Sequence, residues 1–569
     1  MKKDIFYHMN KPDLRAIKPY LEKKIIKGII YYQLVKKARI DGKVKRVWSK
    51  YLGTAGNIEK VYNQVENKTS IQIKSFEYGR TAALMKIAEE LNFIEIINRY
   101  TTKKNVDGLS VGEYLLLLIL GRANGPVSKN KTSEWFKDSF LDIIWSFPHQ
   151  LNTNNFTNHM DYITDEAMNK IEEDIGKFLI NQGLKPSMLF FDTTNFYTYI
   201  ENGENIPQKG KSKEHRSDKN LIGLGLAVSE ENIPLLHESY PGNSPDVKIF
   251  KIIFEKLVER LNALNVPTGD IVLVFDKGCN SKPNIDTVLS KMHIVGSIKK
   301  NQAEELFSVP LENYELLYTN KKKHQVKGYR IKKTVFGTEF TVVASYNSGS
   351  FKKQSETYKK DKIIIFEKLK EIKQSVERTG RGKKKDLKNA LIEASKFVYE
   401  GYKKVFLFEG NEKDNVFSYK VDEEEEKELF LTFGKNLLFT DMHDWTTEKI
   451  VKSYNQKDLI ENDFKWLKTV VLMPIKPIFL QKDSRIKVHS FICVMGLVFY
   501  RYLLWKLKRQ NELLSETRVI EELEKIRVAL VKRDDEKPNF VFENMDLDQM
   551  RLFTELRLDT VLKETRVTV

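Results

Sequence analysis

Two acidic residues follow apolar runs in a way that suggests a shared chemical site. Asp192 lies at the mouth of the predicted strand 188–195, and Asp276 ends the almost wholly apolar run 271–276. Apolar runs of this length, bounded by polar residues or glycine, are typical of buried strands. A carboxylate is costly to bury alone, and two strands of one sheet can bring two such acids together. We therefore predict that Asp192 and Asp276 lie side by side.

A third acid, Glu461, lies far downstream in a segment with helical periodicity. At about 100° per residue, four side chains of this segment fall within a stripe roughly 60° wide: Tyr454, Lys457, Glu461 and Lys468. The sequence therefore predicts one helix face that carries a carboxylate flanked by cations.

The order Asp, Asp and then Glu, with the Glu inside a Tyr-x2-Lys-x3-Glu-x6-Lys pattern, resembles the DDE transposases of bacterial insertion sequences. The pattern is similar to the Tyr-x2-Arg-x3-Glu-x6-Lys signature of their insertion-sequence four superfamily, and only the Arg is replaced, by Lys457. Residues 213–218 (Lys-Glu-His-Arg-Ser-Asp) and 241–246 (Pro-Gly-Asn-Ser-Pro-Asp) resemble the stretch between the family's two aspartates.

The resemblance implies that Asp192, Asp276 and Glu461 are the catalytic residues and the metal ligands. Two unit charges 4 Å apart repel by about 4 kcal/mol at an effective dielectric near 20, a cost that divalent cations remove. Oxygen ligands suit Mg²⁺, with Mn²⁺ as a possible substitute. Two such ions would activate an attacking oxygen and stabilise the leaving 3′ oxygen of a phosphodiester. Asp192 would bridge both ions, Asp276 would bind one, and Glu461 the other.

The resemblance also implies DNA contacts for the basic residues near these acids. Tyr454 and Lys457 would hold a phosphate of the transposon end. Lys465 and Lys468, one and two turns beyond Glu461, would neutralise charge on the same strand. Lysine at position 457 keeps the charge of the family's arginine but loses its bidentate fork.

The loop 208–216 concentrates positive charge near Asp192, where a DNA backbone must approach repelling acids. Lys213 and Arg216 are therefore candidate DNA-binding residues, and a solvated loop is the alternative. His215, Asp218 and His489 could assist the site, but the favoured explanation is a surface loop for the first two and a capped or buried helix position for the third. The resemblance further implies a hairpin at the excised end and a flipped base stacked on an aromatic residue. Core packing is the favoured interpretation for both candidates, Trp445 and Trp466.

Residues 187–300 predict the element order of a ribonuclease-H-like core. The expected fold class is α/β, a ribonuclease-H-like mixed sheet interrupted by a large insertion of strands and basic helices, with an N-terminal β hairpin and a helical DNA-binding region. The expected core elements are strands 188–195, 221–229 and 235–240, helix 245–265, strand 271–276, helix 282–291 and strand 294–298.

Six parts of the chain follow from these patterns. They are an N-terminal β-hairpin element (1–70), a helical region expected to bind DNA ends (71–185), the first part of the catalytic core (186–300), the insertion (301–432), the second part of the core (433–510) and a helical C-terminal region (511–569).

Two of these parts carry much of the basic charge. The predicted hairpin turns at Asp41-Gly42 and could grip phosphates, although a solvated hairpin with Trp48 in a small core is equally well supported. Residues 351–404, predicted as two helices joined by a turn at 379–385, contain 17 basic and 8 acidic residues. An arm along DNA is favoured for them over a hairpin used for dimerisation. The acidic run 422–426 is interpreted as a solvated face.

Composition agrees with a polyanionic partner. The 569 residues carry a formal net charge of +17, which favours nucleic acid, with an anionic membrane surface or a merely lysine-rich surface as alternatives. Two cysteines, Cys279 and Cys493, fit a reducing compartment. No signal peptide is evident, and the most apolar stretches, 114–120 and 491–500, are shorter than the roughly 20 residues that span a membrane. We expect a protein of the bacterial cytoplasm that acts on chromosomal DNA without a membrane.

The sequence therefore favours a transposase that binds the terminal inverted repeats of an insertion sequence. It is expected to act as a homodimer on double-stranded DNA, to cleave it, and to transfer the 3′ ends to target DNA. The alternatives are a DNA-binding protein derived from such an enzyme and another metal-dependent nuclease on the same fold.

Overall fold

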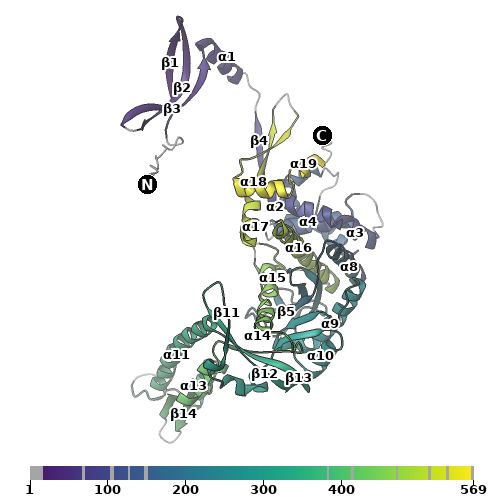
Figure 1. Ribbon diagram of the computed structural model, residues 1–569, viewed down its shortest axis with the longest axis vertical. Coiled ribbons are helices and arrows are strands. Elements are labelled where there is room, and N and C mark those ends of the chain that lie inside the picture. The colour runs from purple at the N-terminus through teal and green to yellow at the C-terminus, as the bar shows by residue number, and fades with distance from the viewer. Residues whose placement is uncertain are drawn as a thin grey trace, which may run out of the picture. The chain divides into compact units, whose positions relative to one another are not determined.

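The computed structural model describes residues 17–40, 42–66, 71–102, 108–125, 128–145, 151–380, 384–411, 416–469, 472–510, 514–533 and 537–564. The chain divides into two compact units, whose elements are labelled in Figure 1. The smaller unit comprises Met1–Ser75 and Val528–Glu543, and the larger comprises Phe76–Arg527 and Asn544–Val569.

The smaller unit contains an antiparallel sheet of β1 (Tyr20–Ile26), β2 (Ile29–Ile40) and β3 (Lys43–Gly53), followed by α1 (Ala55–Glu66). Strand β1 was not predicted, and Asp41 of the predicted turn lies outside the described residues. Val35 is buried, whereas Ile25, Val44 and Tyr51 are more than 60% exposed. This sheet therefore buries little of its own apolar surface.

Strands from distant parts of the chain form a second small sheet in the order β18-β17-β4, with bounds Asn539–Phe542, Arg527–Lys532 and Gln72–Glu77. The prediction of a wholly helical C-terminal region is therefore wrong for β17 and β18. Short apolar runs between charges are compatible with either a helix or a strand. Here the pairing of β17 with the distant strand β4 determines that the segment is a strand. The helices of this region are α17 (Glu516–Lys525), α18 (Leu547–Glu555) and α19 (Thr560–Glu564).

A ten-stranded mixed sheet forms the centre of the larger unit (Figure 1). Its strands are β5 (Met188–Thr198), β6 (Gln208–Lys209), β7 (Asn220–Ser229), β8 (Pro234–Pro241), β9 (Val272–Phe275), β10 (His293–Ser297), β11 (Glu315–Thr319), β12 (Gln325–Val335), β13 (Thr338–Asn347) and β16 (Lys435–Thr440). The order is β11-β12-β13-β16-β10-β9-β5-β7-β6, with β8 paired to β7. Strands β5, β9 and β10 run parallel to one another.

The predicted order of elements in residues 187–300 is confirmed. Strands β5, β7 and β8 are followed by α9 (Asp246–Ala263), β9, α10 (Lys282–Leu289) and β10, and the two-residue β6 and the short helical turn Lys277–Cys279 are added. Each of these strands contains a buried apolar run, which is the pattern that the prediction used.

Strand β5 is longer than predicted, and Asp192 lies within it rather than at its mouth. The antiparallel partner β7 pairs with β5 from Leu189 to Thr198, so the polar residues after Asp192 still have backbone partners. On the other side, β9 pairs only with residues 188–190. Asp192 is therefore internal to its strand but lies two residues beyond the last pair with its parallel neighbour.

A long apolar helix, α16 (Asp483–Arg509), lies beside the sheet and contacts β8 and several other helices. It is long and apolar enough to span a membrane by composition, but 94% of its most apolar window is buried inside the protein. This burial is typical of a core helix of a folded protein. The N-terminal helical region comprises α2 (Gly79–Glu90), α3 (Phe93–Tyr100), α4 (Val111–Ala123), α5 (Lys129–Asp138), α6 (Leu141–Ile144), α7 (Thr153–Met160) and α8 (Asp165–Asn181).

Residues between β13 and β16 form a lobe with its own apolar core (Figure 1). Tyr358, Leu369, Phe406 and Phe417 are all buried in this core. The predicted helical stretch contains two helices, and residues 381–383 of the predicted turn lie outside the described residues. The acidic run begins a helix and is not only a solvated face, because Glu426 accepts hydrogen bonds from Tyr358 and Lys362. The elements of the lobe are α11 (Ser348–Val376), α12 (Leu387–Phe397), β14 (Phe406–Asn411), β15 (Val416–Val421) and α13 (Glu423–Thr432).

A buried ion pair fixes α15 (Asp458–Lys468), the helix that carries Glu461, against α16. Asp463 on α15 accepts a hydrogen bond of 2.7 Å from Nε of Arg501, and the two residues are 0% and 2% exposed. The Arg501 guanidinium also stacks on Trp466, 3.7 Å from the ring centroid. Burial raises the pKa of the Asp463 carboxyl, and Arg501 opposes that rise.

We predict that Arg501→Met lowers the free energy of unfolding by about 3–5 kcal/mol, because it leaves the Asp463 carboxylate buried without its partner. Urea denaturation followed by circular dichroism measures the change. Arg485→Met is the control, since its partner Asp161 is 40% exposed and a pair of this kind contributes about 0–1 kcal/mol. Equal losses in the two variants would contradict the anchoring role of Arg501.

Candidate active site

The parallel pairing of β5 and β9 aligns the two aspartates. Phe190 pairs with Val274, so the same register continued by two residues brings Asp192 opposite Asp276. Neighbouring strands lie about 4.8 Å apart, which makes the two carboxylates neighbours as predicted. Asp276 follows β9 directly and caps a short turn, where its side chain accepts a hydrogen bond from the Lys277 amide.

Glu461 reaches the same place from α15, and one ammonium lies among all three acids. Nζ of Lys457 is 3.8 Å from Oδ2 of Asp192, 3.7 Å from Oδ2 of Asp276 and 3.6 Å from Oε1 of Glu461. The Lys457 side chain is 11% exposed. Because all three oxygens lie within 3.8 Å of the same nitrogen atom, the three carboxylates form one cluster.

The predicted single helix face is wrong, because the helix breaks between Tyr454 and Glu461. Helix α14 (Thr447–Asn455) ends before Gln456, and α15 begins at Asp458. The amide of Lys457 bonds to the carbonyl of Tyr454, three residues back rather than four. This tight turn places Lys457 at the N-terminus of α15. Thr446 caps α14, its side chain accepting a hydrogen bond from the Lys449 amide, and the helix that follows carries Glu461.

Hydrogen bonds orient the Asp276 carboxylate. Ser297 Oγ donates to Asp276 Oδ1 at 2.9 Å, and the Tyr454 hydroxyl donates to Ser297 Oγ at 2.9 Å and to Asp276 Oδ1 at 3.3 Å. Burial alone would raise the pKa of Asp276, but Lys457, Ser297 and the adjacent amide outweigh it and hold the pKa below its usual value. Tyr454 therefore contacts an acid directly.

The Asp192 side chain is less exposed than that of Asp276, 22% against 41%. Burial raises the pKa of its carboxyl, although Lys457 and Lys213 oppose the rise. Nζ of Lys213 donates to the Thr193 carbonyl at 2.6 Å and lies 3.9 Å from Oδ2 of Asp246. Thr193 Oγ1 in turn donates to Asp246 Oδ1 at 2.9 Å. These contacts hold a cation next to Asp192.

The other candidate DNA-binding residues lie farther from the acids. Lys468 Nζ donates to Thr194 Oγ1 at 2.7 Å, so it remains close to β5. Lys465 bonds to Asn462 on its own helix. Arg216 forms two hydrogen bonds of 2.8 Å with Asp218 and lies 4.8 Å from the ring centroid of Tyr197.

The weaker candidates are mostly packed. His489 is 1% exposed and Trp445 is 8% exposed, while Trp466 packs against Tyr500 and Arg501. Both tryptophans thus have the packing contacts that the sequence favoured.

Sequence reasoning missed Ser297 and assigned no role to Thr193 or Asp246. Ser297 is the last residue of β10, but the apolar Ile298 follows it, so the sequence pattern did not mark it as Asp276 was marked. Asp246 belongs to the segment 241–246 that resembles the transposases. Only the folded chain shows that it contacts Thr193 and Lys213.

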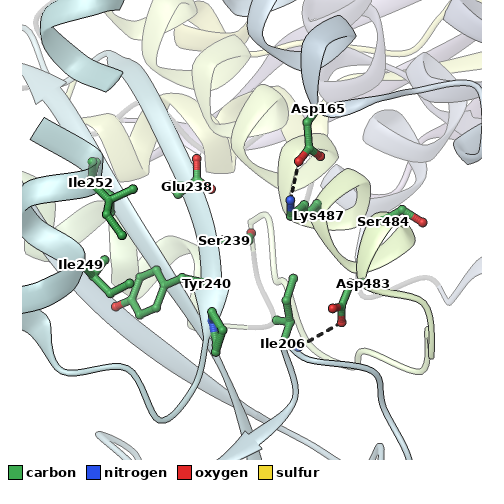
Figure 2. A pocket seen from close by; sticks show the side chains of 12 residues that line it. Asp165, Ile206, Glu238, Ser239, Tyr240, Ile249, Ile252, Asp483, Ser484 and Lys487 are labelled. Carbon is green, nitrogen blue, oxygen red and sulfur yellow. Dashed lines mark hydrogen bonds and ion pairs between the residues drawn. The ribbon is translucent and has the colours of Figure 1, made fainter. Parts of the chain in front are cut away.

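One cavity of the larger unit lies away from the acids. Figure 2 shows it between β8, α9 and the start of α16, with the Asp165–Lys487 ion pair and Asp483 on its wall. Its volume is about 440 Å³, and none of the three acids lines it. The acids instead lie on an open part of the surface, where Glu461 is 49% and Asp276 41% exposed. A polymer could approach them there.

The donor set fits a hard divalent cation. In the described part of the chain, no group of three or more His, Cys, Asp or Glu side chains is close enough to hold a metal as it stands. The three carboxylates nevertheless surround one cationic group at nearly equal distances, and carboxylate oxygens are the ligands that Mg²⁺ and Mn²⁺ prefer.

Comparison with known proteins assigns the family. The family model described as "Transposase DDE domain" matches residues 184–495, more than half of the chain. The chain therefore belongs to the transposase DDE domain family. The match begins just before β5 and ends inside α16, so it includes all three acids and the lobe between β13 and β16. No curated protein matches the sequence.

We predict that the effects of Tyr454→Phe and Ser297→Ala on the free energy of unfolding are not additive, because the two hydroxyls form one chain to Asp276. Their coupling should be about 0.5–3 kcal/mol in a double-mutant cycle. A cycle of Tyr454→Phe with Ser139→Ala, whose hydroxyl bonds to Phe136, provides the control. Additivity in both cycles would contradict the assigned network.

Proposed function

We propose that this protein is an active transposase of the insertion-sequence four superfamily, with a ribonuclease-H-like core. In this proposal it binds the terminal inverted repeats of its element, cleaves the DNA and transfers the 3′ ends to target DNA. The observation that carries the proposal is the convergence of Asp192, Asp276 and Glu461 on one cationic position, within a DDE-domain transposase.

Asp192, Asp276 and Glu461 are the proposed catalytic residues and would hold Mg²⁺, with Mn²⁺ as a substitute. When bound, such ions supply an activated attacking oxygen and stabilise the leaving 3′ oxygen of a phosphodiester. Ser297 and Tyr454 orient Asp276 by the hydrogen bonds described above. Asp192 is the least exposed of the three acids, with 22% of its side chain exposed.

Lysines beside the acids are proposed to bind the DNA backbone. Lys213 and Lys468 both bond to residues that directly follow Asp192 on β5, so a strand entering the site would pass their ammonium groups. Tyr454 and Lys457 would contact the phosphate nearest the acids, and Lys465 and Arg216 would contact phosphates farther away. The net charge of +17 supports a polyanionic substrate.

The remaining parts of the proposal concern organisation. The strands of residues 1–70 and the helices of 71–185 are proposed to recognise the DNA ends, the lobe within 301–432 to contact DNA or a second copy, and 186–300 with 433–510 to form the catalytic core. We propose a homodimer on double-stranded DNA in the bacterial cytoplasm, without a membrane.

Two other functions remain testable alternatives. A transposase-derived DNA-binding protein would bind element ends without cutting them. Another metal-dependent nuclease on this fold would cleave but not transfer a 3′ end to a second duplex. The complete set of three acids favours the transposase over the first alternative.

The acids provide the first test. Asp192→Asn, Asp276→Asn and Glu461→Gln should each lower Mg²⁺-dependent cleavage and strand transfer on element ends by at least about a thousandfold. Glu448→Gln is the matched control, because this acid lies on α14 and pairs with Lys452. Wild-type rates in any of the three acid variants would refute the assigned site. Cleavage without transfer would favour the nuclease, and binding without cleavage the DNA-binding protein.

The lysines provide a second test. Lys468→Met should weaken binding to element ends and reduce the slope of log affinity against log salt by about one, because one phosphate contact is lost. Lys251→Met, an exposed lysine paired with Glu255 on α9, should leave the slope unchanged. A slope unaffected by Lys468→Met would place this lysine outside the DNA interface.

A further inference from the structure

The geometry points to Lys457 as a built-in substitute cation. We propose that its ammonium holds the three carboxylates together before a divalent ion arrives, and that it must leave when the ion binds. This inference rests on the proposed function, because it takes the three acids to be metal ligands. It assigns to Lys457 a positioning role that the DNA-contact proposal does not include.

The position of the ammonium carries the inference. It lies at almost equal distances, 3.6 to 3.8 Å, from oxygens of all three acids. These separations are ion-pair distances rather than short hydrogen bonds, so the charge is shared and is not committed to one partner. The side chain is 11% exposed, and its ion-pair partners in the described chain are these three carboxylates.

The backbone around Lys457 supports the same role. The turn between α14 and α15 projects this lysine from the helix start, while its carbonyl accepts the amide hydrogen of Glu461. Lys457 and Glu461 are therefore held together by one turn of chain. A lysine ammonium is cationic at neutral pH, and three neighbouring carboxylates favour that charged form.

An ammonium and a divalent ion cannot share this position. Mg²⁺ takes oxygen ligands at about 2.0–2.1 Å, closer than any of the three oxygens is to Nζ, and the two cations repel each other. Ion binding therefore requires Lys457 to withdraw. A lysine suits this movement, because its ammonium is a compact, strongly hydrated charge on a flexible stem, whereas an arginine fork is planar and larger.

The movement of the Lys457 ammonium away from the acids also gives this side chain a second role. The ammonium that leaves the acids becomes available to a phosphate of the DNA strand that approaches them. One lysine would then stabilise the empty acid cluster and afterwards bind the substrate. The lysine in place of the family's arginine is the sequence feature on which this exchange depends.

Chemical labelling of the wild-type chain tests the exchange without any substitution. Lysines are acetylated with N-hydroxysuccinimidyl acetate in EDTA or in Mn²⁺, and the labelled peptides are quantified by mass spectrometry. Labelling of Lys457 should rise several-fold in Mn²⁺. Lys452 on α14, which is 54% exposed and paired with Glu448, should be labelled equally in both. If electron paramagnetic resonance shows bound Mn²⁺ while Lys457 stays protected, the proposal is overturned.

Substitution supplies an independent readout. In the absence of DNA, Lys457→Met should bind Mn²⁺ at least about tenfold more tightly than the wild type, because the competing cation is gone. It should also have a lower thermal midpoint in EDTA that Mn²⁺ restores. Lys452→Met should change neither quantity. Unchanged or weaker Mn²⁺ binding by Lys457→Met would contradict the proposal.

The measurements separate this inference from the proposed function. Suppose that Asp276→Asn abolishes Mn²⁺ binding but Lys457→Met leaves the Mn²⁺ affinity unchanged. The assignment of the metal site would then stand, and only the substitute-cation role of Lys457 would be overturned. Absence of Mn²⁺ binding by the wild type and by Lys457→Met would overturn both.

Discussion

Carboxylates brought together at one place repel one another, and those of Asp192, Asp276 and Glu461 come from distant parts of the chain. The Lys457 ammonium, within 3.8 Å of each, offsets that repulsion. The rest of the larger unit can be understood from this requirement. Parallel strands β5 and β9 set the spacing of the aspartates, and the turn before α15 delivers both the lysine and the glutamate to them.

Rigid supports hold these groups at the site. The buried Asp463–Arg501 pair fixes the opposite side of α15 to α16, which is itself buried in the core. Ser297 at the end of β10 and Tyr454 at the end of α14 orient Asp276. Each support comes from a different element, so the positions of the three acids depend on the packing of the whole sheet with its helices.

The sequence predicted the parts of this arrangement that depend on local pattern. Apolar runs identified β5, β9 and β10, and residue spacing selected the three acids. The helix break at Lys457 could not be placed from the sequence, because the periodicity of the segment is helical throughout. The extension of β5 past Asn195 and the strands β17 and β18 were missed because pairing with remote strands determines them. Ser297 could not be singled out either, because the apolar Ile298 follows it and only the folded chain brings its hydroxyl to Asp276.

The central claim is that three acids from distant positions form one divalent-ion site. Anomalous diffraction from crystals of the full chain grown with Mn²⁺ and a short element-end duplex tests it most directly. The account predicts anomalous density bound by oxygens of Asp192, Asp276 and Glu461, with Lys457 displaced from between them. Mn²⁺ bound elsewhere, with the Lys457 ammonium still among the three carboxylates, would contradict it.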